Sequence, residues 1–148
     1  MKKNRAFVIT EPQTDQHWQD YYQLRWLLLR KPWHQVQGTE KDSLESVAYH
    51  RMALDNGKVI AVARIHIVGS DMAQIRYMAV HADYQGQQIG ALLLDKLEQV
   101  VQKQGVKKVI LNSRESACGF YLKGGYTVVA PSYVLYGLIP HFLMEKWL

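Results

Sequence analysis

Apolar positions recur at helical spacing most clearly in the second half of the chain. Over residues 88–104 they line one side of a helix, and Gly105 follows directly, so this segment is predicted to be a helix with one buried face. The same spacing predicts a second amphipathic helix over residues 15–30, which Pro32 ends. Shorter helices are predicted at two further places, residues 43–50 and 116–123.

The pattern between the two long helices is that of strands. Residues 51–55 and 58–68 are separated by Asn56-Gly57, a pair that readily adopts the positive φ angles of a tight hairpin. A turn then leads into a third strand over residues 72–80. Further strands are predicted at residues 5–9, 106–111, 126–130 and 141–147. The predicted fold class is α+β, a mixed but mostly antiparallel central sheet of about six or seven strands flanked by about four helices.

Length and composition are those of one folded domain. With 148 residues, of which 48% are hydrophobic and 21% charged, residues 1–148 are predicted to form a single domain. No apolar stretch is long enough for a signal peptide or a membrane span, so we expect no membrane partner. The single cysteine, Cys118, excludes an internal disulfide and a cysteine-rich zinc site, and it fits the reducing cytoplasm.

The net charge of +5 suits an anionic partner without identifying it. The basic residues are dispersed, and their two small clusters match no nucleic-acid-binding signature, so nucleic acid is not predicted as a partner. The clusters are Lys2, Lys3 and Arg5, and Lys103, Lys107 and Lys108. The six histidines form no metal-binding spacing, so no metal site is predicted.

The segment that reads IRYMAVHADYQGQQIGALLL carries the strongest chemical signal. A strand ends at Val80, a glycine-containing loop follows, and a helix begins near Gln88. A helix N-terminus presents unpaired N–H groups, and small residues such as Gly86, Gly90 and Ala91 let a phosphate approach closely. The spacing matches neither the dinucleotide-binding G-x-G-x-x-G nor the P-loop. The segment therefore predicts a diphosphate site, although the steric need for glycine in such a turn explains the glycines alone equally well.

At these residues the sequence resembles the GNAT family of N-acetyltransferases. Residues 78–80 and 84–91 are similar to the family's acetyl-CoA signature, in which a strand is followed by a Q/R-x-x-G-x-G/A loop that opens a helix. Residues 120–126, reading FYLKGGY, are similar to a later F-Y-x-x-x-G-F/Y segment, and residues 139–146 to the terminal strand. The front half resembles a bacterial subgroup that includes modules fused to a hotdog thioesterase-like domain. The resemblance implies a GNAT-like fold.

The resemblance implies acetyl-CoA as the acyl donor and assigns residues to it. Backbone groups of the strand end would pair with the pantetheine arm, and N–H groups of the following loop would hold the pyrophosphate. The implied cofactor-binding residues are Met78, Ala79, Val80, Gln85, Gly86, Gln87, Gln88, Ile89, Gly90, Ala91 and Arg114. Gln88 stands where the family has a glycine, which is tolerable if its backbone angles are ordinary. Arg114 stands where many relatives carry Asn or Gln, and it could reach a phosphate or an acidic substrate.

The implied reaction is direct attack of a primary amine on the acetyl group in a ternary complex. The resemblance places Tyr121 as the general acid that protonates the departing thiolate. The general base is left unassigned, with His66 and Glu115 as candidates that are each more simply read as structural. Cys118 is read as a small packing residue. In the resembling family the front helix and the loop after it wall the acceptor pocket, so Arg25, Arg30 and Trp33 are candidates for acceptor contacts.

Several alternatives stay open from the sequence. A catalytically weak or inactive acyl-CoA-binding or sensing module of the same fold is the alternative function. The aromatic segment 131–137 is predicted to be a loop that either covers the acceptor site or forms a homodimer contact. The acceptor amine itself stays unidentified.

Overall fold

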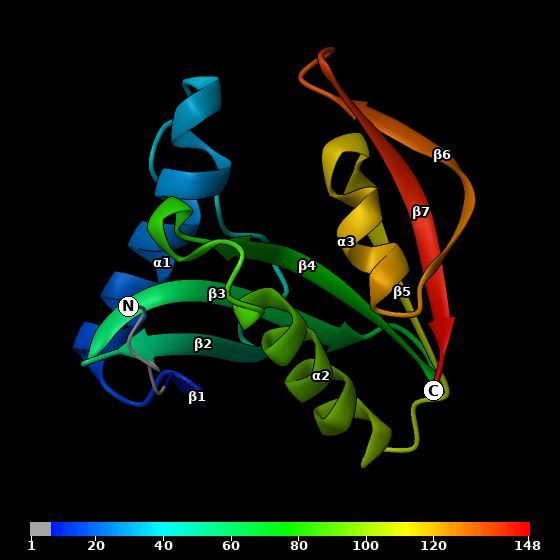
Figure 1. The fold of residues 1–148 in the computed structure, drawn as a ribbon, viewed down its shortest axis with the longest axis horizontal. Coiled ribbons are helices and arrows are strands. Elements are labelled where there is room, and N and C mark those ends of the chain that lie inside the picture. Colours follow the sequence, from blue (N-terminus) through cyan, green and yellow to red (C-terminus); the bar gives the residue numbers. More distant parts are fainter. Residues whose placement is uncertain (1–6) are drawn as a thin grey trace. The chain divides into compact units, whose positions relative to one another are not determined.

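The computed structural model describes residues 7–148, whose strands form a seven-stranded sheet in the order β1-β2-β3-β4-β5-β7-β6 (Figure 1). The strands are β1 Val8–Thr10, β2 Tyr49–Asp55, β3 Lys58–Ile67, β4 Met72–Val80, β5 Lys108–Arg114, β6 Thr127–Leu135 and β7 Ile139–Trp147. The α-helices are α1 Asp15–Leu29, α2 Ile89–Gln102 and α3 Cys118–Lys123. Short 3-10 helices are η1 Lys31–Trp33, η2 Ala82–Tyr84 and η3 Glu115–Ala117. The predicted α+β class and the mostly antiparallel sheet are confirmed.

The described residues form two compact units. One comprises residues 7–64 and 77–97, and the other residues 65–76 and 98–148. The single domain over residues 1–148 stays a prediction. The start of the predicted strand at residues 5–9 and the basic cluster Lys2, Lys3 and Arg5 lie outside the described residues.

In the first unit, α1 packs against the hairpin of β2 and β3. Thr14 begins the helix, because its Oγ1 accepts a hydrogen bond from the His17 N–H at 3.0 Å. The buried face of α1 meets the sheet in an apolar cluster made of Tyr21, Leu24, Met52, Val59 and Val62. Asn56 and Gly57 both have positive φ, 49° and 81°, which confirms the predicted tight hairpin.

The predicted helix over residues 43–50 is wrong. Residues 43–47 form turns, and β2 already begins at Tyr49. The carboxylates of Asp42 and Glu45 are instead bonded to Arg64 of β3, at 2.6 Å each. Ion pairs with a distant strand therefore fix the conformation of this segment. The predicted helix would instead have placed these polar side chains in water.

In the second unit, β4 pairs with β5 in parallel and β7 pairs antiparallel with both β5 and β6. The β6 strand is mostly exposed, and its register against β7 shifts twice, between Val128 and Ala130 and between Pro131 and Val134. The predicted loop over residues 131–137 is therefore partly wrong, since residues 131–135 continue the strand. Pro131 is tolerated there because an edge strand offers positions where no N–H is needed for pairing.

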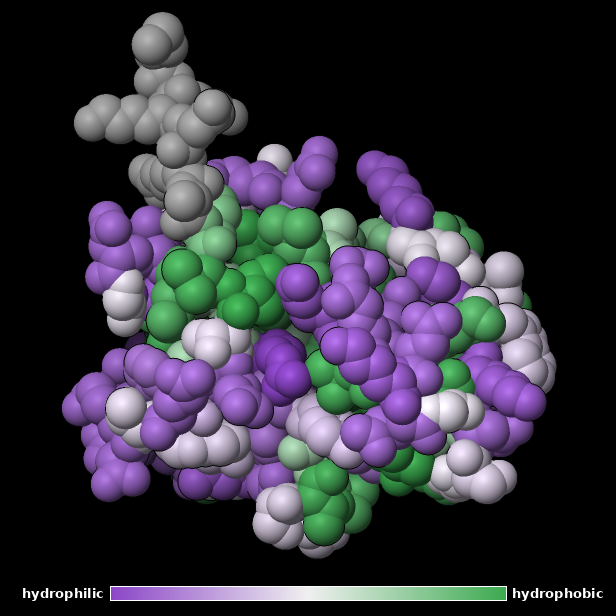
Figure 2. Space-filling model, turned by 90° about the horizontal axis from the view of Figure 1, so that it is seen from below, coloured by the Kyte–Doolittle hydropathy of each residue, from purple (hydrophilic) through white to green (hydrophobic). Residues whose placement is uncertain are grey.

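The face of the molecule in Figure 2 is mostly hydrophilic, with smaller apolar areas between the polar side chains. Across residues 7–148, no helix is both long enough and apolar enough to cross a membrane.

Candidate functional site

The loop before α2 presents a row of backbone N–H groups. The first bond of the helix runs from the Leu92 N–H to the Gln88 carbonyl at 3.1 Å. The N–H groups of Ile89, Gly90 and Ala91 precede that bond, so the helix itself supplies no acceptor for them. The helix is 14 residues long, and residues 85–88 in front of it are exposed. This arrangement can hold a phosphate group at the positive end of the helix dipole.

The backbone of this loop takes two left-handed steps. Gly86 has a φ of 78° and Gln88 a φ of 63°. The condition under which a non-glycine residue is tolerable at position 88, ordinary backbone angles, is therefore not met. A side chain with a Cβ atom is disfavoured in this conformation by about 1–2 kcal/mol, which explains why a glycine suits this position in the resembling sequences.

The other end of the loop is anchored by side chains. The buried Tyr84 donates its hydroxyl to Asp55 at 2.7 Å, and the Asp83 N–H donates to the His81 ring at 3.1 Å. Gln85 donates its amide N–H to the Val80 carbonyl at 3.3 Å. One of the strand-end groups expected to pair with the pantetheine arm is thus already bonded by a neighbouring side chain.

The end of β4 is irregular. The parallel pairing of β4 with β5 runs from Met72 to Ile75, and Tyr77 then takes a positive φ of 59°. A residue in this conformation interrupts an extended strand. The following residues 78–80, which the sequence assigns to the cofactor, are half-buried.

Guanidinium groups surround the ring of Tyr77 in the first unit. Those of Arg25, Arg64 and Arg30 lie 4.4, 4.9 and 5.6 Å from the ring centroid. Cation–π attraction of this kind holds an aromatic ring in place. The position of the irregular residue of β4 is therefore tied to two arginines that are themselves fully buried.

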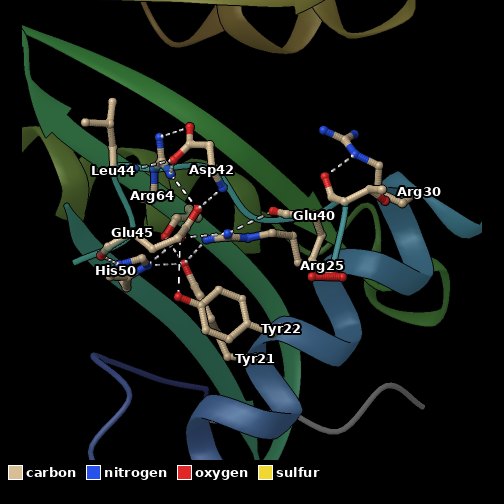
Figure 3. A network of polar contacts seen from close by, with 12 residues as sticks. Tyr21, Tyr22, Arg25, Arg30, Glu40, Asp42, Leu44, Glu45, His50 and Arg64 are labelled. Carbon is tan, nitrogen blue, oxygen red and sulfur yellow. Dashed lines mark hydrogen bonds and ion pairs between the residues drawn. The ribbon is translucent and has the colours of Figure 1, made fainter. Parts of the chain in front are cut away.

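The two buried arginines belong to a network that Figure 3 shows from close by. Arg25 donates to Glu45 at 2.8 Å, to the Glu40 carbonyl at 3.1 Å and to the Tyr21 hydroxyl at 3.0 Å. The second carboxylate oxygen of Glu45 accepts from Arg64 at 2.6 Å. The expectation that Arg25 contacts the acceptor is wrong, because its side chain is 0% exposed and its two terminal nitrogens donate to groups inside the protein.

The network shifts the pKa of its members. Burial on its own would raise the pKa of Glu45, but hydrogen bonds and charges, chiefly from Arg25, outweigh it and lower the pKa below the usual 4.5. Burial lowers the pKa of His50, and the charges of Arg25 and Arg64 lower it further against the bond to the Glu45 carbonyl. Burial and the Glu45 carboxylate raise the pKa of Tyr22 to about 12. At neutral pH the network therefore holds ionised Glu45 and neutral His50.

Arg30 and Trp33, the other two expected acceptor contacts, lie at and beyond the end of α1. Arg30 donates to the carbonyl oxygens of Thr39 and Leu29, at 3.0 and 3.1 Å. Trp33 ends η1 and is half-buried. In the same unit, a cavity of about 450 Å³ is lined by Glu11, Pro12, Trp18, Tyr22, Glu45, Ser46, Ala48, Tyr49, His50 and Arg51.

Tyr121, the predicted general acid, is buried in α3 of the second unit. Its ring makes edge contacts with Phe120 and Tyr126, with centroids 5.0 and 5.9 Å away. Tyr126 is fixed in turn by a hydrogen bond from its hydroxyl to Glu98 at 2.8 Å. Burial, with a smaller contribution from Cys118, raises the pKa of Tyr121 above its usual value. The phenol is therefore protonated at neutral pH and can donate a proton.

Arg114 and Cys118 lie together near Tyr121. Arg114 ends β5 and is half-buried, and its carbonyl accepts a hydrogen bond from the Cys118 thiol at 3.6 Å. Of the candidate bases, His66 is buried within β3, and Glu115 is exposed in η3. No group of three or more potential metal ligands is found among residues 7–148.

One polar residue of this unit was not singled out by the sequence. His141 of β7 is buried, and its Nδ1 lies 2.9 Å from the Ile139 carbonyl. The sequence signal available was only a histidine inside the predicted last strand, which by itself says nothing about the partners of the ring.

Comparison with known proteins agrees with these features. The profile of the acetyltransferase (GNAT) family matches residues 18–126. A Bacillus subtilis (strain 168) protein named as an acetyltransferase is 32% identical over 107 residues, 72% of this chain and 71% of that protein. The structure of an aminoglycoside 6'-N-acetyltransferase complexed with coenzyme A superposes with a TM-score of 0.80 at 16% identity, covering 95% of this chain and 96% of that one. Escherichia coli ElaA superposes with a TM-score of 0.78 at 22% identity, covering 96% and 99%.

The two structures share the fold, while the profile spans most of the chain, including the loop before α2 and Tyr121. The chain belongs to the acetyltransferase (GNAT) family.

Proposed function

We propose that this protein transfers an acetyl group from acetyl-CoA to a primary amine, by direct attack in a ternary complex. The observation that carries the proposal is the loop before α2, where three N–H groups precede the first helical hydrogen bond and Gly86 and Gln88 take left-handed backbone angles. Membership of the acetyltransferase family and a neighbour whose structure contains coenzyme A support it.

The proposed cofactor contacts come from the loop and the strand before it. The N–H groups of residues 87–91 would bind the pyrophosphate, with Gln85 and Gly86 shaping the approach to them. Backbone groups of Met78 and Val80 would pair with the amides of the pantetheine arm as an added strand does, with Ala79 between them. The Gln85 amide on the Val80 carbonyl would yield to the arm, and Arg114 would bind a phosphate or an acidic group of the acceptor.

The reaction requires three proton transfers. The acceptor ammonium loses a proton, and the free amine attacks the carbonyl carbon of the thioester, forming a C–N bond. Collapse of the tetrahedral intermediate breaks the C–S bond, and the nitrogen loses its second proton as the amide forms. Tyr121, whose pKa is raised by burial, would give its proton to the thiolate, so that CoA leaves as a thiol.

Binding and chemistry are tested separately. We expect calorimetry to detect acetyl-CoA binding, and Tyr121→Phe to reduce turnover by about 100-fold or more without changing acetyl-CoA affinity, because general acid catalysis is typically worth that much. Tyr126→Phe is the matched control, since it removes a buried phenol next to Tyr121 that is bonded to Glu98. Absence of binding at millimolar acetyl-CoA would refute the proposed function, and unchanged turnover in Tyr121→Phe would remove its role.

The left-handed Gln88 favours one second candidate, an acyl-CoA sensor without turnover. Gln88 stands where the resembling family has a glycine, and it is held in a backbone conformation that disfavours a residue with a Cβ atom. A sensor would bind acetyl-CoA and release no CoA thiol with any amine.

Other proposals concern the surroundings of the protein. One cysteine among 148 residues supports a cytoplasmic location. A homodimer contact or an acceptor lid would use the exposed turn after β6, where Tyr136 has a positive φ of 54°. The resemblance of the front half to modules fused to a hotdog domain stays a prediction.

A further inference from the structure

We infer that His141 is the general base that takes a proton from the acceptor ammonium group, a role that rests on the proposed acetyl transfer. The inference comes from the state in which the fold holds the imidazole ring, with one nitrogen bonded inside the protein and the other left for a proton.

The tautomer of His141 is fixed by its own strand. Its Nδ1 lies 2.9 Å from the Ile139 carbonyl, and a carbonyl oxygen can only accept a hydrogen bond. Nδ1 must therefore carry the hydrogen, which leaves Nε2 with a lone pair in the neutral ring. Within the described residues, Nε2 has no hydrogen-bond partner and is not sealed from solvent. This is the arrangement that a histidine base requires.

The ring is also held in one orientation. It stacks on the ring of Tyr133, with centroids 4.5 Å apart and planes 15° from parallel. Tyr133 can reach it because the β6–β7 register shifts between Pro131 and Val134, so two residues of β6 lie opposite His141. A bulge of this kind redirects a side chain that a regular strand would point elsewhere. The register shift of β6 thus places the ring of Tyr133 against that of His141.

The charge state suits a base at neutral pH. Burial lowers the pKa of His141, and the charge of Arg114 lowers it further, while the bond to the Ile139 carbonyl acts in the opposite direction. Arg114 is its register partner on β5, and Tyr133 faces it from β6. Glu115 of η3, which also packs against β7, is exposed. The neutral ring therefore dominates above the ordinary histidine pKa of 6.5.

The proposed base and the proposed acid belong to the same unit. Arg114, opposite His141, accepts through its carbonyl a hydrogen bond from Cys118, the first residue of α3. Tyr121 follows on the same helix. The end of β5 thus connects the strand that carries the base with the helix that carries the acid.

The proton balance is complete with these two residues. Nε2 of His141 takes one proton from the ammonium group, the free amine forms the C–N bond, and the C–S bond breaks. The thiolate takes the proton of Tyr121, and the phenolate recovers one from the nitrogen that becomes the amide. His141 then releases its proton to solvent, so that each turnover yields the amide, CoA thiol and one proton.

The tautomer can be tested without an acceptor. In long-range proton–nitrogen NMR spectra of the whole chain, we expect His141 to carry its hydrogen on Nδ1 and to titrate below pH 6.5. A hydrogen on Nε2 in the neutral ring would overturn the inference.

The catalytic role is tested with His141→Asn, because the Asn amide can still donate to the Ile139 carbonyl but is not basic. We expect CoA release from acetyl-CoA, with the better of lysine amide and tyramine as acceptor, to fall about 100-fold or more. The acidic limb of the pH–rate profile should move to the higher pKa of the acceptor, and acetyl-CoA affinity should be unchanged. His34→Asn is the control, since His34 is exposed and its φ of 59° suits Asn.

The two proposals fail in different ways. If the unmodified protein does not bind acetyl-CoA, the proposed function is refuted together with the base. If it binds acetyl-CoA and releases CoA at the same rate and with the same pH profile in His141→Asn, only the role of His141 is refuted.

Discussion

Replacing Gln88 by glycine is expected to stabilise the protein, although glycine usually destabilises. Gln88 has a φ of 63°, which disfavours a residue with a Cβ atom by about 1–2 kcal/mol. Glycine removes that penalty but adds about 0.5–1 kcal/mol of conformational entropy to the unfolded chain. The net expectation for Gln88→Gly is therefore a gain of about 0.5–1 kcal/mol in the free energy of unfolding.

The neighbouring Gln87 supplies the matched control. It is also an exposed glutamine of this loop, but its φ is not in the left-handed region. Gln87→Gly should therefore only add conformational entropy to the unfolded chain, which lowers the free energy of unfolding by about 0.5–1 kcal/mol. The two variants have the same composition, and they should differ by about 1–2 kcal/mol with opposite signs relative to the unmodified protein.

Urea denaturation at pH 7, analysed by linear extrapolation, measures both free energies of unfolding. For a chain of this size a gain of about 1 kcal/mol also raises the melting temperature by about 2–4 °C. Calorimetry with acetyl-CoA should show no loss of affinity in Gln88→Gly, because the loop keeps its N–H groups. If both variants lose stability equally, the left-handed angle carries no penalty and the reasoning is refuted.

The remaining predictions concern the buried network and its response to acid. Glu45→Gln should cost about 3 kcal/mol in the free energy of unfolding, because two buried guanidinium groups lose a shared carboxylate. The control Glu11→Gln removes a carboxylate from an exposed pair and should cost less than about 0.5 kcal/mol. Equal costs of the two substitutions in urea denaturation would contradict this prediction. Because the pKa of Glu45 is lower in the folded than in the unfolded chain, its stabilisation is complete above pH 4.5 and is lost as the pH falls below that value. The pKa values of His50 and His141 are also lowered, so these two histidines begin to destabilise the fold below about pH 6.5. The Glu45 contribution is therefore measured between pH 4.5 and 3, as the part of the slope of unfolding free energy against pH that Glu45→Gln removes.

Features set by a few neighbouring residues could be predicted from the sequence. The hairpin at Asn56-Gly57 and the long helix α2 are correct because positive φ angles and one apolar face are local properties. The helix predicted over residues 43–50 is wrong because its one acidic side chain, that of Glu45, binds arginines from α1 and β3, about 20 residues away in either direction. Spacing within a segment contains no information about such partners.

The candidate site shows the same limit. The loop and its cofactor type follow from a signature of adjacent residues, but the left-handed angle of Gln88 depends on the path of the chain into α2. Arg25 has the charge expected of a substrate contact, and only its burial shows that it is structural. The role proposed for His141 depends on a hydrogen bond to a carbonyl two residues away and on stacking against a ring of a strand whose register is irregular. That irregularity could not be predicted from the alternation of apolar and polar residues.

The broken register of β6 also bears on how the protein behaves at high concentration. An edge strand of nine residues with exposed Val128, Val129 and Val134 would, if flat and regular, be a template for aggregation through strand addition by another chain. Pro131 offers no N–H, and the two register shifts twist the rest of the edge out of line. An incoming strand could therefore form only short runs of hydrogen bonds, so the bulge that orients Tyr133 also protects the apolar edge from self-association into fibres.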